Sequence, residues 1–150
     1  MQNKISKGLY KKFLKNMPIF CVDLIIDRDK KVLLVKRKDE PCKNQWWVPG
    51  GRVYKNEKTE DAAIRKARGE TGLDVEIVKR VGFYEPMLKE AQFGIKTGTH
   101  NPVVVYHLKS KSDQEVYLDE TSSGYRWIDR IETDMDDYMK TILKDSKVFD

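Results

Sequence analysis

Cysteine is scarce in this 150-residue chain, which contains only Cys21 and Cys42. Two isolated thiols are not spaced as zinc ligands and cannot form a disulfide framework. Long hydrophobic runs are also missing. No segment approaches the 18 apolar residues that a transmembrane helix needs, and no apolar stretch follows a basic start as in a signal peptide. We therefore expect a cytoplasmic protein that does not act in the membrane.

Internal repeats, low-complexity tracts and linkers rich in proline or glycine are absent too. The length fits one domain, so residues 1–150 are expected to form a single unit. Charged residues make up 35% of the chain, and 29 basic against 24 acidic residues leave a net charge of +5. Mixed signs argue against a disordered polyelectrolyte. A basic surface suits an anionic ligand, but no RNA-binding or zinc-finger pattern accompanies it, so no nucleic-acid partner is expected.

Both ends of the chain have helical patterns. Residues 1–17 predict an amphipathic helix, because apolar residues recur every fourth position and Pro18 then ends the pattern. The predicted apolar stripe consists of Ile5, Leu9, Phe13 and Met17. Residues 134–150 predict a second amphipathic helix, centred on 136–144.

Strand patterns fill most of the region between these helices. The segments expected to be strands are 19–26, 31–37, 46–48, 75–84, 103–108 and 125–128. One helix is expected over 59–72, with Thr59 as its N-cap and Gly72 as its C-cap. Residues 85–102 form a long loop, a feature that is often functional. Because strands do not alternate regularly with helices, the fold class is α/β with a mixed sheet flanked by helices.

The most informative segment begins at Gly51. Five residues separate Gly51 from Glu57, seven separate Glu57 from Arg65, and the motif ends with Glu70, Gly72 and Leu73. Ala67 is a small apolar residue at an aliphatic position. This spacing resembles the Nudix box, G-X5-E-X7-R-E-U-X-E-E-X-G-U with U aliphatic. The resemblance implies a Nudix hydrolase with a mixed β-sheet sandwiched between α-helices.

Three acidic positions of that box carry the metal chemistry. A helix brings residues i, i+3 and i+4 onto one face, where carboxylates can bind Mg²⁺ and bridge it to substrate phosphates. Here these positions hold Lys66, Gly69 and Glu70. The resemblance therefore implies a single Mg²⁺ or Mn²⁺ ion, bound by the backbone oxygen of Gly50 and the carboxylate of Glu70, with Thr121 as a further ligand. Gly69 allows two explanations, close approach of a ligand or backbone, or decay of a lost site.

These departures resemble one Nudix subgroup, the GDP-mannose mannosyl hydrolases, which also lack two box glutamates and keep the last one. The similarity covers most of residues 10–130 and is most telling over 48–53. It implies hydrolysis of a nucleoside diphosphate sugar by attack at the anomeric carbon, with nucleoside diphosphate and free sugar as products. Dimers are typical of the subgroup, so a homodimer is expected.

The resemblance also assigns roles to individual residues. Asp23 would contact the substrate near the sugar, and Arg37 and Arg52 would draw charge from the leaving diphosphate, a task that suits the guanidinium fork. Arg65 would bind substrate from the box helix, and His100 would contact substrate from the long loop.

The resemblance supplies no general base at the matching position of this chain. The subgroup has a Gln-His pair where this chain has Thr121 and Ser122, and a hydroxyl is far too weak a base. We expect Glu120, or its neighbour Asp119, to act as the base. The alternative is that His100 moves into the site from the long loop. Two alternatives stay open. One is a pyrophosphohydrolase that attacks phosphorus with Glu120 as base, and the other is a non-catalytic module that binds a nucleotide sugar.

Overall fold

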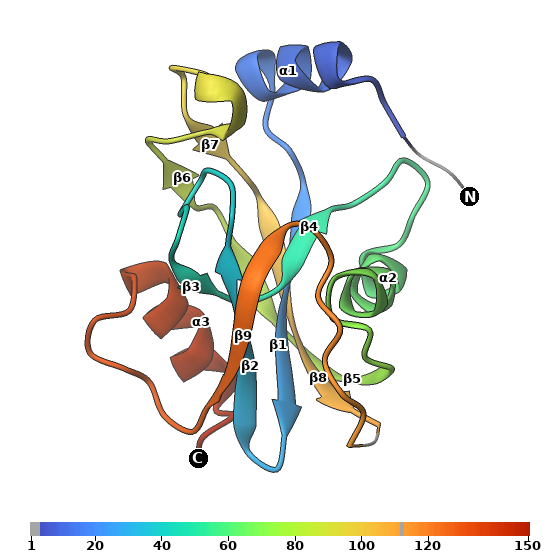
Figure 1. Cartoon of the computed structure of the whole chain (residues 1–150), viewed down its shortest axis with the longest axis vertical. Helices are drawn as coiled ribbons and strands as arrows, with labels where there is room; N and C mark the ends of the chain where they lie inside the picture. The colour runs from blue at the N-terminus through green and yellow to red at the C-terminus, as the bar shows by residue number, and fades with distance from the viewer. Residues whose placement is uncertain (1–3, 112) are drawn as a thin grey trace.

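The computed structural model describes residues 4–111 and 113–150. Within these residues a mixed β-sheet lies between two helices, and a third helix covers one end (Figure 1). In chain order the elements are α1 (Lys7–Asn16), β1 (Cys21–Arg28), β2 (Lys31–Arg37), β3 (Trp46–Trp47), β4 (Gly50–Arg52), α2 (Thr59–Thr71), β5 (Val75–Tyr84), β6 (Met87–Leu88), the 3-10 helix η1 (Gln92–Gly94), β7 (Thr99–His100), β8 (Val103–Ser110), β9 (Ser122–Ile128) and α3 (Asp137–Ser146).

The main sheet has the strand order β3-β2-β1-β8-β5, and β4 and β9 pair with β1 and β2. Its centre is parallel, because β1 runs alongside β8 from Cys21 opposite Val103 to Asp27 opposite Lys109. The other pairs in this sheet are antiparallel. The expected mixed sheet between helices is therefore confirmed.

Alternation along β1 produces two apolar layers, because successive strand residues face opposite sides of a sheet. Val22, Leu24 and Ile26 belong to the core beneath α2, whereas Ile25 belongs to the core beneath α3. The helix residues buried in these layers are Ala62, Ala63 and Ala67 of α2 and Met139, Ile142 and Leu143 of α3. Small alanines let α2 lie close to the sheet that carries the site.

The ends of α2 confirm one prediction and correct another. Gly72 is the C-cap, with the left-handed φ of 73° that glycine adopts readily. The N-cap is Lys58 and not Thr59, which is already helical. The Thr59 hydroxyl instead lies 2.6 Å from the hydroxyl of Tyr106 on β8, so this side chain ties the helix to the sheet.

The predicted apolar stripe of the first helix was correct for Phe13 and wrong for Leu9 and Met17. Helix α1 begins only at Lys7, because Ser6 caps it by accepting a hydrogen bond from the amide of Leu9. Leu9 and Met17 are exposed, and the packing face is formed by Tyr10, Phe13 and Leu14 against Ile19, Cys21 and Val103. Residues 1–3 of the predicted 1–17 helix lie outside the described residues, and the helix predicted within 134–150 covers Asp137–Ser146.

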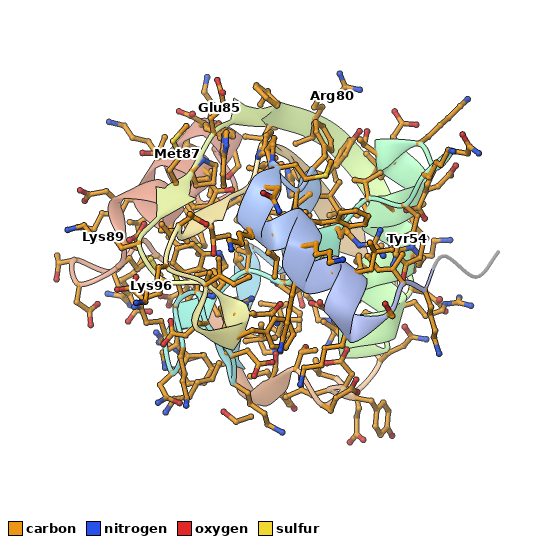
Figure 2. The ribbon with its side chains drawn as sticks, turned by 90° about the horizontal axis from the view of Figure 1, so that it is seen from above. Tyr54, Arg80, Glu85, Met87, Lys89 and Lys96 are labelled. Carbon is orange, nitrogen blue, oxygen red and sulfur yellow. The ribbon has the colours of Figure 1, made fainter. Side chains whose placement is uncertain are left out.

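The segment expected to be a long loop, 85–102, contains β6, η1 and β7. Seen from above, α1 lies across the end of the molecule beside this segment, which carries Met87, Lys89 and Lys96 (Figure 2). Helix α1 and the 85–102 segment together cover one end of the sheet. Among the described residues, no helix has both the length and the apolar character needed to cross a membrane.

Candidate active site

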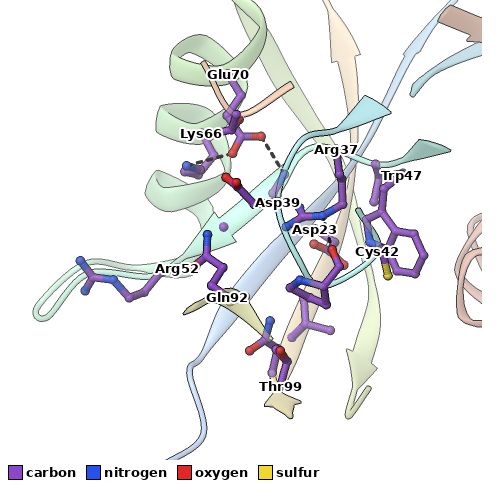
Figure 3. Close-up of a pocket in the computed structure, with 18 of the residues that line it drawn as sticks. Asp23, Arg37, Asp39, Cys42, Trp47, Arg52, Lys66, Glu70, Gln92 and Thr99 are labelled. Carbon is purple, nitrogen blue, oxygen red and sulfur yellow. Dashed lines mark hydrogen bonds and ion pairs between the residues drawn. The ribbon is translucent and has the colours of Figure 1, made fainter. Parts of the chain in front are cut away.

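A cavity of about 370 Å³ lies where the ends of β1, β2 and β4 meet α1, α2 and the 85–102 segment. Charged side chains of both signs line it (Figure 3). The acidic ones are Asp23, Asp39 and Glu70, and the basic ones are Arg37, Arg52, Arg65 and Lys66. The excess of fixed positive charge suits an anionic ligand.

Asp23 is an acidic residue within an otherwise apolar strand, and its surroundings explain how it is accommodated. The hydroxyl of Tyr138, on α3, donates a hydrogen bond of 2.6 Å to Oδ2 of Asp23. Burial raises the pKa of Asp23 from its ordinary 3.8 to about 6, although the Tyr138 hydrogen bond and the nearby Arg37 oppose this change. Asp23 therefore changes protonation near neutral pH.

The strand that faces Asp23 needs glycine. Gly50 on β4 pairs with Asp23 on β1. A Cβ atom on Gly50 would lie 2.4 Å from Oδ1 of Asp23 and 2.4 Å from the carbonyl oxygen of Val22. Because no side chain fits there, Gly50 lets β4 approach the acid closely and brings its own backbone into the cavity.

Glu70 connects helix α2 to this strand. Its Oε2 accepts a hydrogen bond of 3.2 Å from the amide of Gly50, and its Oε1 lies 3.0 Å from the ammonium nitrogen of Lys66. Burial raises the pKa of Glu70, while the Lys66 charge works against that rise. The carboxylate thus has a cation beside it before any metal ion binds.

Arg65 and Glu57 form a forked ion pair. Nε and Nη2 of Arg65 lie 2.7 and 2.9 Å from the two carboxylate oxygens of Glu57. Nη2 also donates to the carbonyl of Arg52, and the guanidinium lies 3.7 Å from the ring centroid of Tyr54. These contacts fasten the connection between β4 and α2, so in this structure Arg65 supports the site through its neighbours.

Arg37 and Arg52 line the cavity from the ends of their strands. Nε of Arg37 donates to the carbonyl oxygen of Pro41 at 2.7 Å, which fixes the guanidinium against the loop after β2. The guanidinium of Arg52 lies 4.8 Å from the ring centroid of Tyr54. Both arginines are half-buried, where charge–charge interactions are stronger than in open solvent.

The structure brings some of the predicted site residues to the cavity and leaves others outside it. Thr121 lines the cavity, but its hydroxyl donates to Oδ1 of Asp119 at 2.5 Å. Glu120 and His100 are exposed and do not belong to the lining, although His100's neighbours Thr99 and Asn101 do.

Asp39 and Tyr138 are two of the cavity residues that were not predicted from the sequence. Asp39, in the loop after β2, points into the same cavity as Asp23 and Glu70 (Figure 3). Tyr138 stacks on Trp47, with ring centroids 5.8 Å apart, and reaches Asp23 across 115 positions of sequence. No spacing signal could have found Tyr138, because tertiary packing alone brings α3 there.

The described residues fit one divalent ion better than a cluster of ions. They contain no group of three or more histidine, cysteine, aspartate or glutamate side chains placed to bind a metal. Glu70 accepts a hydrogen bond from the amide of Gly50, while the expected backbone ligand is the carbonyl oxygen of that residue. Mg²⁺ commonly takes only one or two carboxylates, completing its shell with water and substrate phosphates. Such an ion would share Glu70 with Lys66.

Comparison with known proteins bears on the family and the fold of the chain. A sequence model of the NUDIX domain matches residues 17–145. The low-salt glycan biosynthesis protein Agl8 of Haloferax volcanii is 43% identical over 82 residues, 55% of this chain and 53% of that protein. An ADP-ribose pyrophosphatase of Methanocaldococcus jannaschii is 42% identical over 67 residues, 45% of this chain and 40% of that protein. The matches to these curated relatives thus span about half of their length.

A solved structure shows the same fold over most of the chain. The MutT NUDIX hydrolase of Burkholderia pseudomallei superposes with a TM-score of 0.72 and 24% sequence identity. The superposition covers 87% of this chain and 98% of that one. At this identity the likeness establishes the fold.

Proposed function

The chain belongs to the NUDIX family, and we propose that within it the protein hydrolyses a nucleoside diphosphate sugar to nucleoside diphosphate and free sugar. One observation carries the proposal. The cavity lining holds a single box carboxylate, Glu70, which pairs with Lys66, and it also includes Arg37 and Arg52. Fixed cations suit a diphosphate that leaves as an anion, whereas attack at phosphorus in two-metal enzymes uses a clamp of ions.

Two further findings support this choice of substrate. The similarity to a glycan biosynthesis protein of Haloferax volcanii fits a substrate that contains an activated sugar. The cavity also has polar side chains beyond the charged ones, namely Gln92, Thr99 and Asn101. Amide and hydroxyl groups can donate to and accept from sugar hydroxyls or a nucleobase edge.

The proposed reaction divides the work among named side chains. Water attacks the anomeric carbon, the bond from this carbon to the diphosphate oxygen breaks, and the electron pair leaves with the diphosphate. Arg37 and Arg52 bind the leaving diphosphate, and Asp23 holds the sugar. A divalent ion held by Glu70 and Gly50 would neutralise diphosphate charge when bound.

The proton of the attacking water needs an acceptor in the cavity. A base must come within hydrogen-bonding reach of that proton, and Asp39 lines the cavity whereas Glu120 does not. We therefore favour Asp39 as the base and keep Glu120 as its rival. Asp39→Asn and Glu120→Gln form a matched pair of variants, and the one that loses turnover while retaining substrate binding identifies the base.

Phosphorus NMR in water enriched in heavy oxygen tests the reaction. The protein is incubated with Mg²⁺ and GDP-mannose, GDP-glucose or ADP-ribose. Unlabelled nucleoside diphosphate is expected, because the oxygen from water then enters the sugar. Labelled monophosphate or sugar phosphate would overturn the proposal and establish attack at phosphorus, the reaction suggested by the similarity to the ADP-ribose pyrophosphatase. Tight binding without any product would favour the non-catalytic binding module.

We also propose that the protein forms a homodimer through α1 and its surroundings. Leu9 and Met17 are exposed on α1 and at its end, and the exposed rings of Phe20 and Phe83 stack 6.4 Å apart. Light scattering at micromolar concentration should give twice the 17.6 kDa chain mass. A monomeric mass would remove this part of the proposal.

A further inference from the structure

Lys66 stands where the family motif has an acid, and its surroundings suit a side chain directed into the site. It lines the cavity from α2, and its side chain is only 22% exposed. The side chain of Lys66 passes close to Gly51 on β4. A Cβ atom on Gly51 would lie 2.5 Å from Cε and 2.9 Å from Nζ of Lys66. The absence of a side chain on Gly51 therefore leaves room for the lysine and its ammonium group.

The ammonium group also has donors to spare. A lysine has three N–H donors, and Oε1 of Glu70, 3.0 Å away, is the partner of one (Figure 3). Arg65, by contrast, is engaged by Glu57 and by the carbonyl of Arg52. Lys66 can keep its contact with Glu70 and still donate to a phosphate oxygen in the cavity.

We propose that Lys66 is a resident cation that binds the diphosphate of the substrate together with Arg37 and Arg52, taking the position that a metal ion takes where this box residue is an acid. The inference depends on the proposed function, since it assumes a diphosphate ligand in this cavity. It adds that the diphosphate binds without any divalent ion. Hydrogen bonds between ionised partners are the strong class, and partial burial shields these three cations from solvent.

Calorimetry of the full chain in EDTA tests the inference, with GDP and inorganic pyrophosphate as probes. Wild type is expected to bind both without metal. Lys66→Met should weaken this binding about ten- to a hundredfold, the effect of losing one charge-assisted hydrogen bond, and Lys66→Arg should restore most of it. Lys66→Gln, which keeps a hydrogen-bond donor, covers the case in which methionine disturbs folding.

The matched control is Arg68→Met, on the same helix. Arg68 is exposed and pairs with Asp74, and neither residue lines the cavity, so metal-free binding should not change. A complementary variant, Lys66→Glu, restores the acid of the family motif. It should lose metal-free diphosphate binding and bind Mn²⁺ more tightly, as measured by electron paramagnetic resonance of free Mn²⁺.

The outcomes separate this inference from the function on which it depends. If Lys66→Met binds GDP in EDTA as wild type does, or if wild type binds GDP only with Mg²⁺, the inference fails while the proposed function stands. If wild type binds none of inorganic pyrophosphate, GDP, GDP-mannose and ADP-ribose, with or without Mg²⁺, both fail.

Discussion

Asp23→Asn is expected to make the protein more stable and less active at neutral pH. Burial raises the pKa of Asp23 from 3.8 to about 6, so the folded state resists ionisation of this carboxyl. That interval corresponds to about 3 kcal/mol, at about 1.4 kcal/mol for each pKa unit. Asparagine is neutral at every pH and can still accept the hydrogen bond that Tyr138 donates to Asp23.

The stability difference between Asp23→Asn and the wild type should depend on pH. Well below the ordinary pKa of 3.8, Asp23 is protonated in both the folded and the unfolded state, and the substitution should alter stability little. Between about pH 4 and pH 6 the unfolded wild type ionises before the folded wild type does, so ionisation opposes folding of the wild type alone. The stability difference should therefore grow mainly over this interval, from near zero at about pH 3 to about 3 kcal/mol in favour of the variant at about pH 8.

Urea unfolding at several pH values, in EDTA, measures this difference. The control is Asp134→Asn, in the exposed loop before α3, which should give a difference that is small at every pH. A stability difference for Asp23→Asn that does not depend on pH, or a variant less stable than wild type at pH 8, would refute the reasoning. Loss of sugar-nucleotide turnover in a more stable protein would show that the acid is kept for function.

Three other substitutions test separate parts of the structure. Glu70→Gln should abolish metal-dependent turnover while leaving the circular dichroism spectrum intact, and turnover at the wild-type rate would remove the metal site from Glu70. Arg65→Lys should lower stability by about 1–2 kcal/mol in urea unfolding, because lysine cannot make the forked contact with Glu57. An unchanged urea midpoint would mean that the Arg65–Glu57 ion pair contributes little to stability. Gly69→Ala should raise stability by about 1 kcal/mol in thermal unfolding, since glycine is costly inside a helix and a Cβ there meets no atom within 4 Å; a drop would reveal a hidden constraint.

Local patterns in the sequence were sufficient to predict most of the fold. The hairpin of β1 and β2 follows from two β-rich runs around a polar turn, and the end of α2 follows from Gly72, which adopts the predicted left-handed conformation. The α1 stripe was wrong at Leu9 and Met17 because the i, i+4 spacing alone does not determine which helix face meets the rest of the protein. The face that packs contains Tyr10 and Leu14 together with Phe13 of the predicted stripe.

The residues of the candidate site also differ in whether the sequence alone could identify them. Arg65 and Glu70 lie within one motif on α2, so their spacing in sequence translates directly into spacing on a helix, and Glu57 precedes that helix by two residues and pairs with Arg65. Tyr138 and Asp39 have no such relation to the motif, and only the packing of α3 and the path of the loop after β2 bring them to the cavity. Sequence reasoning can therefore find the residues of a motif, whereas partners contributed by distant elements need the structure.

The two departures from the metal motif have different structural consequences. At Gly69 a larger side chain would meet only open space, so nothing in the folded chain requires glycine there. Lys66, in contrast, is half-buried, pairs with Glu70 and occupies the room that Gly51 leaves. Gly69 offers no side-chain ligand where the family motif has an acid, whereas Lys66 places a cation in the cavity beside Glu70. Placing an acid at each of the two positions in turn should therefore have unequal effects on metal-free diphosphate binding, with Lys66→Glu weakening it and Gly69→Glu changing it less.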